Sequence, residues 1–230
     1  MSRLRVLRQL PVAVVVAIAL VVAALSGAGA SAPATSTPTA AQVRVHPDGL
    51  NSRELAFHDH MRKLWEDHIT WTRLAIVTFA DGSKGFSATA ARLLRNQTAI
   101  GNAIKPFYGK AAGDRLSALL HAHITIAVAV LQAAKAGDAP AFKKATKRWY
   151  ANVNDIADFL AHANPKFWPD KMMRADMKTH LDQTLAEAAD ELHGHYRASV
   201  RDYEALHRHM LAMADMLSNG IIGAFPGAFR

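Results

Sequence analysis

The chain has 230 residues, of which 50% are hydrophobic and 20% are charged, and it contains no cysteine. This composition excludes a collagen-like chain or one that is disordered over most of its length. The lack of cysteine excludes disulfides, thiolate catalysis and Cys-ligated zinc. Aromatic residues make up only 7% of the chain and alanine is common, which favours helices over a β-sandwich or a barrel. The net charge is +8, but the densest basic run, residues 143–148, has the pattern of a solvated helix face, so no nucleic-acid partner is expected.

The first 30 residues have the pattern of a secretory signal peptide. Three arginines are followed by an apolar run over residues 10–25 and by small residues that include Ala28-Gly-Ala30, a suitable site for signal peptidase. An uncleaved membrane anchor is the alternative, although the run is shorter than the ~20 residues of a typical span. Residues 31–50, rich in Ser, Thr, Pro and Ala, are expected to form a flexible linker. The sequence therefore predicts a secreted protein, possible association with the cell envelope, and one folded domain over residues 51–230.

From Asn51 onward, apolar residues recur every three or four positions, which predicts helices throughout. Gly, Pro and Asp signals divide this region into six segments. The expected helices are about Ser52–Ala80, Ser87–Lys105 (ending before Pro106), Asp114–Ala136, Asp138–Asn164, Asp170–Leu192 and Tyr196–Phe225. Because the connections are short, we expect an all-α fold, a six-helix up-down bundle built from three αα-hairpins.

A weak internal repeat runs through these segments. In the first, third and fifth expected helices, a histidine is followed by Ile or Leu and, four residues on, by a small residue. Polar residues occupy matching places in the other three helices, at intervals of 27 to 29 residues. The repeated positions are His68, Asn96, His123, Asn152, His180 and His207. One helix and one turn form the repeat, which places all six residues in one cross-sectional layer of the bundle.

Two interpretations of this layer remain open. The histidines have apolar neighbours and are expected to point inward, where burial would lower the pKa of each imidazole below its usual value of about 6.5. They could form a buried hydrogen-bonded layer with Asn96 and Asn152. They could instead bind zinc or copper, with the candidate ligands His68, His123, His180 and His207. The sequence does not say whether the odd-numbered helices bring their histidines together.

Other polar groups are less informative. His193-Gly-His195 lies at an expected turn, where both rings could reach one surface metal ion. Glu187, Asp190 and Glu191 have the spacing of a solvated helix face. The sequence contains no nucleophile elbow, no phosphate-binding glycine loop and no HExxH. An enzyme would therefore need a His-bound metal and a water nucleophile, with Glu66 or Glu187 as the proton carrier.

Several strings resemble those of a family of exported bacterial all-helical proteins. They are Leu64-Trp-Glu-Asp-His-Ile-Thr-Trp-Thr-Arg73, Leu93-Leu-Arg-Asn-Gln97, Ile104-Lys-Pro-Phe-Tyr-Gly109, Trp149-Tyr-Ala-Asn152, Ala163-Asn-Pro165, His180-Leu-Asp-Gln-Thr184 and Met213-Ala-Asp-Met216. The resemblance spans about Ser52 to Phe229 and implies a helical fold and bacterial export, with no activity and no catalytic residues. We therefore expect a binding or interaction module, and the alternative is a metal-binding protein or metal-dependent enzyme that uses inward-facing histidines.

Overall fold

The computed structural model describes residues 49–230, so the expected leader and most of the expected linker lie outside the described residues. Within this range the chain forms five α-helices and a short 3-10 helix. These are α2 (Ser52–Ala80), α3 (Phe86–Ala136), α4 (Ala139–Ala163), α5 (Asp170–Leu192), α6 (Tyr196–Ala224) and η1 (Pro226–Phe229). No strand occurs over residues 49–230, and the predicted all-α fold class is confirmed.

Local capping signals explain where several helices begin and end. The side chain of Asn51 accepts a hydrogen bond from the backbone N–H of Glu54 (3.1 Å), and the Glu54 carboxylate accepts one from the Asn51 N–H (2.8 Å). This reciprocal capping box starts α2. The Asp138 carboxylate accepts from the Ala141 N–H (2.9 Å) and starts α4. Gly137, at φ +72°, ends α3 in the left-handed conformation that glycine adopts without strain.

The predicted count of six helices is not confirmed, because two of the expected helices are parts of α3. Pro106 lies inside α3, and the helix continues to Gly109, where φ 83° and ψ 167° are not helical. The chain folds back there, since a Cβ built on Gly101 would lie 2.4 Å from the carbonyl oxygen of Gly113. Those two residues would be about 18 Å apart in a straight helix. We call residues 86–108 the N-terminal arm of α3 and residues 110–136 its C-terminal arm.

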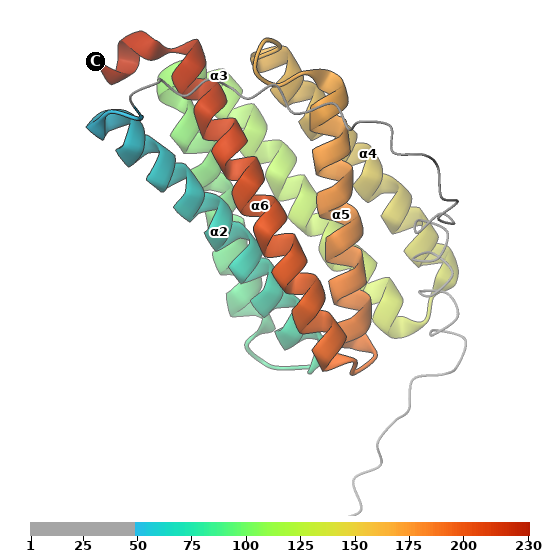
Figure 1. Ribbon diagram of the computed structural model, residues 1–230. Helices are drawn as coiled ribbons and strands as arrows, with labels where there is room; N and C mark the ends of the chain where they lie inside the picture. Colours follow the sequence, from blue (N-terminus) through green and yellow to red (C-terminus); the bar gives the residue numbers. More distant parts are fainter. Residues whose placement is uncertain (1–48) are drawn as a thin grey trace, which may run out of the picture.

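The helices pack side by side around one core (Figure 1). α2 contacts α3 and α6, α4 contacts α3 and α5, and α5 contacts α6. The core receives buried side chains from all five helices, among them Trp65, Ile100, Trp149, Leu181 and Ile221. The guanidinium of Arg53 donates to the carbonyl of Arg230, so the two ends of the described chain meet. The helical segments thus close into a ring, in which α2, the C-terminal arm of α3 and α5 occupy alternate places.

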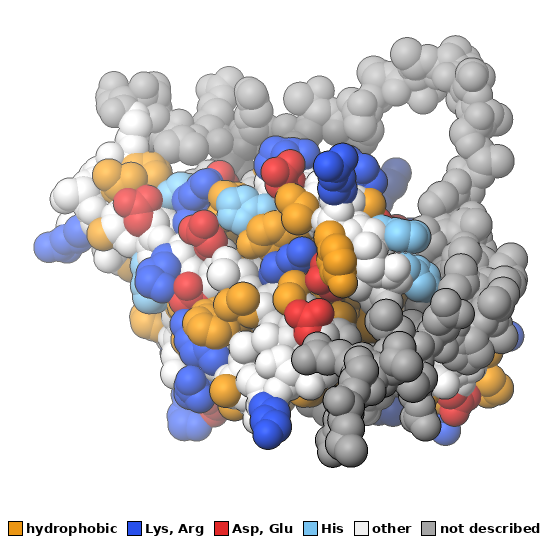
Figure 2. Space-filling model, turned by 90° about the horizontal axis from the view of Figure 1, so that it is seen from below, with side chains coloured by type: hydrophobic (Ala, Val, Ile, Leu, Met, Phe, Trp, Pro, Cys, Tyr) orange, Lys and Arg blue, Asp and Glu red, His pale blue; other side chains and the backbone are white. Residues whose placement is uncertain are grey.

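The surface carries charges of both signs. On the face seen from below, basic and acidic side chains are interspersed with apolar ones and with imidazoles (Figure 2). Among the described helices, α3 has the length and apolar composition of a membrane span. This is weak evidence, since helices of a protein core meet the same criteria.

Candidate functional site

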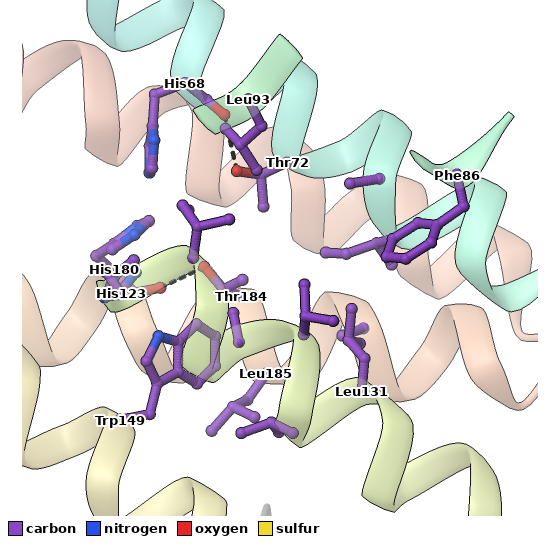
Figure 3. A pocket seen from close by; sticks show the side chains of 17 residues that line it. His68, Thr72, Phe86, Leu93, His123, Leu131, Trp149, His180, Thr184 and Leu185 are labelled. Carbon is purple, nitrogen blue, oxygen red and sulfur yellow. Dashed lines mark hydrogen bonds between the residues drawn. The ribbon is translucent and has the colours of Figure 1, made fainter. Parts of the chain in front are cut away.

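Three histidines come together in the core, one each from α2, the C-terminal arm of α3 and α5. The ring centroids of His68 and His180 are 5.7 Å apart, those of His123 and His180 5.8 Å, and those of His68 and His123 6.4 Å. Each residue is only 2 or 3% exposed. We call His68, His123 and His180 the histidine cluster. Their rings lie near one another at one end of a pocket (Figure 3).

Hydrogen bonds show that the repeat in the sequence is also a repeat in space. In each hairpin, a polar side chain of the second helix donates to the backbone carbonyl of the residue four positions before the histidine of the first helix. The donor and acceptor pairs are Asn96 Nδ2 and Leu64 O (2.9 Å), Asn152 Nδ2 and Leu119 O (3.1 Å), and His209 Nε2 and Asp176 O (3.0 Å). The bundle therefore consists of three equivalent hairpins, with one member of the histidine cluster in each.

His207 lies apart from the histidine cluster. Its Nε2 is 3.3 Å from the Glu66 carboxylate, and its side chain is 30% exposed. The matching place in the third hairpin belongs to His209, which is 29 residues after His180, just as Asn152 is 29 residues after His123. The predicted interval of 27 residues pointed to the wrong histidine because residues two apart on a helix face opposite sides. His193 and His195 also lie elsewhere, at the connection between α5 and α6, with ring centroids 5.7 Å apart.

The three clustered imidazoles are neutral at pH 7. Burial, together with the neighbouring imidazole of His123, lowers the pKa of His68 to about 3. Burial lowers the pKa of His123 to about 4 and that of His180 well below its usual value. The predicted direction of the shift is confirmed. Each neutral ring has one nitrogen with a free lone pair, which is the form that binds a metal ion.

The outer nitrogens of the three rings differ in their partners. His68 Nδ1 is 3.1 Å from Gln97 Nε2, and His123 Nδ1 is 3.1 Å from Asn152 Oδ1. His180 Nδ1 is buried and has no hydrogen-bond partner among residues 49–230. The sequence analysis missed Gln97 and named its neighbour Asn96, although the signal was present, since Gln97 is 29 residues after His68.

A small cavity of about 40 Å³ adjoins the histidine cluster. Its far end is lined by apolar side chains, including Phe86, Leu131 and Leu185 (Figure 3). Thr72 and Thr184 line it as well, and their hydroxyls donate to the backbone carbonyls of His68 and His180. A volume of this size holds one or a few water-sized groups. The three imidazoles therefore form the polar end of an otherwise apolar cavity.

A second buried polar group joins α2, α5 and α6. Arg73 lies 3.1 Å from carboxylate oxygens of both Glu187 and Glu191, and the Ser199 hydroxyl donates to Glu191. Burial raises the pKa of Glu187 to about 7, although Arg73 opposes the shift. The expectation of a solvated face is wrong for Glu187 and Glu191, which are 0% and 5% exposed. Arg73 on α2 compensates their charge in the interior, which the spacing within α5 could not indicate.

No three His, Asp or Glu side chains in the described part of the chain place their donor atoms close enough to hold a metal ion as they stand. Three imidazoles around one zinc ion, with Zn–N bonds of about 2.1 Å, would have ring centroids roughly 5 to 5.5 Å apart. The histidine cluster is wider than this by about 1 Å or less. Comparisons of this chain with protein-family models, with curated proteins and with solved structures find no match.

Proposed function

We propose that this protein binds one transition-metal cation, zinc or copper, through His68, His123 and His180. The convergence of three buried, neutral imidazoles from three different helices carries this proposal. Imidazole nitrogen suits both metals, and three histidines with an open fourth position form a known type of zinc site. A small inward movement of the rings would bring them to ligand distance.

A layer that only forms hydrogen bonds explains the histidine cluster less well. It accounts for His68 and His123, whose Nδ1 atoms contact Gln97 and Asn152. It leaves the buried Nδ1 of His180 without a partner among the described residues. Burying such a polar nitrogen unpaired costs about 1 to 3 kcal/mol. A cation bound by the cluster would compensate for desolvating the three rings.

The proposal is one of binding rather than catalysis. Glu66 contacts His207 at the surface, and Glu187 contacts Arg73, so neither of the two carboxylates suggested as proton carriers hydrogen-bonds to the histidine cluster. We also propose that the protein acts after export, as its leader sequence predicts. In a chain without thiols, imidazoles are the strongest ligands for a soft or borderline cation.

Elemental analysis tests the proposal on protein purified without a histidine tag, loaded with Zn²⁺ or Cu²⁺ and then desalted. We expect one bound ion per chain, because the cluster provides a single set of three rings. His180→Asn removes one ligand while keeping a polar side chain of smaller size, and should lose most of the metal. His207→Ala is the matched control and should retain it.

Circular dichroism must show that both variants are folded. A folded wild-type protein without stoichiometric metal would refute the proposal. So would a folded His180→Asn protein that retains the ion.

A further inference from the structure

Gln97 is a fully buried amide whose orientation is fixed by its neighbours. Its Nε2 lies 2.9 Å from the carbonyl oxygen of Leu93 and 3.2 Å from Asn96 Oδ1. Asn96 is itself oriented, since its Nδ2 donates to the carbonyl of Leu64. Exchanging the oxygen and nitrogen of the Gln97 amide would place its oxygen against two other oxygens. Gln97 therefore faces His68 Nδ1 with a nitrogen that donates.

The amides next to His68 and His123 impose opposite tautomers on the two rings. His68 Nδ1 accepts from Gln97 Nε2 at 3.1 Å, so the single proton of this neutral ring is on Nε2. At His123 the arrangement is reversed, because Asn152 Nδ2 donates to the carbonyl of Leu119 and Asn152 Oδ1 faces His123 Nδ1. That ring carries its proton on Nδ1 and has a free lone pair on Nε2.

We propose that Gln97 is a positioning residue that holds His68 in the Nε2–H tautomer and thereby lowers the affinity of the histidine cluster for a cation. This inference rests on the proposed function and adds a regulatory group to the same site. A ring with Nε2–H can donate to a neighbouring imidazole but cannot bind an ion through that nitrogen. His123 has the correct tautomer for binding through Nε2, and His68 does not.

Binding through Nε2 of both rings requires one rearrangement at His68. The proton leaves Nε2 and one is taken up at Nδ1, with no change in the charge of the ring. The amide of Gln97 must then turn, so that its Oε1, which is buried without a partner among residues 49–230, accepts from Nδ1–H. Turning costs the hydrogen bonds from Gln97 to Leu93 and Asn96, and this cost is subtracted from the binding free energy.

Long-range ¹H–¹⁵N correlation spectra of histidine-labelled protein, recorded with a chelator present, report each tautomer directly. We expect Nε2–H for His68 and Nδ1–H for His123. Gln97→Glu presents a carboxylate that accepts from His68, and should convert that ring to Nδ1–H. Asn152→Asp is the matched control, since it keeps an accepting oxygen and should leave His123 unchanged. Finding His68 as Nδ1–H in the wild-type protein would overturn the inference.

Zinc affinity, measured by competition with a chromophoric chelator, provides the second readout. Gln97→Glu should bind Zn²⁺ about 10-fold more tightly or better, because groups that orient metal-bound histidines change affinity by roughly 10 to 100-fold. If Gln97→Glu does not fold, Gln97→Met removes the donor with little change in volume, and His68 should then populate both tautomers.

The outcomes separate the two proposals. Tautomers as inferred, in a protein that binds no zinc, would refute the proposed function and leave the orienting effect of Gln97 standing. Zinc bound equally well by wild-type and folded Gln97→Glu protein would refute the role of Gln97 and leave the metal site standing.

Discussion

Arg73 is a single cation that lies between two buried carboxylates, those of Glu187 and Glu191. The group is costly to form, because burial of a charge in a protein interior costs several kcal/mol even after relaxation. The raised pKa of Glu187, about 7, shows this cost. At the scale of one residue, the fold thus depends on a guanidinium whose two partners are more than 100 positions away in the sequence.

Arg73→Ala should destabilise the protein by roughly 3 to 5 kcal/mol at pH 8, because it leaves buried carboxylates uncompensated. The effect should be smaller at pH 5. The folded-state pKa of Glu187 lies above its ordinary value of 4.5, so the folded chain keeps a proton that the unfolded chain releases. The resulting stabilisation is fully present below pH 4.5 and is lost as the pH rises to about 7. Urea midpoints of wild-type and variant protein at both pH values measure the difference.

Arg62→Ala is the matched control for this experiment. Arg62 pairs with Asp215, but both side chains are about one third exposed, and such pairs contribute less than about 1 kcal/mol. Equal destabilisation by Arg73→Ala at pH 8 and pH 5 would contradict the assignment of a buried charge to Glu187.

Individual residues of the site were predictable where a repeat constrained them. His68, His123 and His180 recur at similar positions in three helices, and apolar neighbours indicated that they point inward. Gln97 was missed because its neighbour Asn96 also fits the repeat, and a spacing that is uncertain by one residue cannot choose between them. Glu187 and Glu191 were misread because a carboxylate looks solvated in a sequence until its distant partner is known.

At the scale of the helical element, α3 is the least regular part of the described chain. Its two arms reverse at Gly109 and come into backbone contact at Gly101 and Gly113. A Cβ on Gly101 would lie 2.0 Å from Ser117 Oγ and 2.4 Å from the Gly113 carbonyl oxygen. The reversal therefore depends on two residues without side chains, and it positions the arm that carries His123.

Gly101→Ala should reduce the free energy of unfolding by about 2 kcal/mol, because backbone atoms must move to admit the methyl group. This loss exceeds the gain of roughly 1 kcal/mol that alanine brings inside an ordinary helix. Gly227→Ala is the control, since no atom lies within 4 Å of the Cβ that it would add. Denaturant unfolding measures both variants, and equal stability of the two would show that the arms do not touch as described.

Helix boundaries followed from the sequence wherever a capping side chain marks them, as at Asn51 and Asp138. The end expected before Pro106 was wrong for a physical reason. A proline disfavours helical backbone at the preceding residue but does not forbid it, and Pro106 lies only three residues from the end of the N-terminal arm. Gly109, rather than the proline, provides the backbone conformation that the reversal requires.

At the scale of the whole molecule, the described helices begin at Ser52, well after the expected leader. Cleavage between Ala28 and Pro33 would therefore leave all five helices intact. Intact-mass spectrometry of protein recovered from the culture medium should place the mature N-terminus in that interval, because small residues there follow a basic and then an apolar segment. Recovery from membranes alone, with Met1 or Ser2 still present, would instead show a membrane anchor.

The closure of the ring has a consequence for the order of its parts. Arg53 contacts Arg230, α6 packs against α2, and the three hairpins repeat the same hydrogen bond around the histidine cluster. Residues 164–169, between α4 and α5, separate the second hairpin from the third. A circularly permuted chain that started there and joined residue 230 to Ser52 would contain the same three hairpins in the same cyclic order. None of the hairpins is structurally the first or the last, although one gene must begin with one of them.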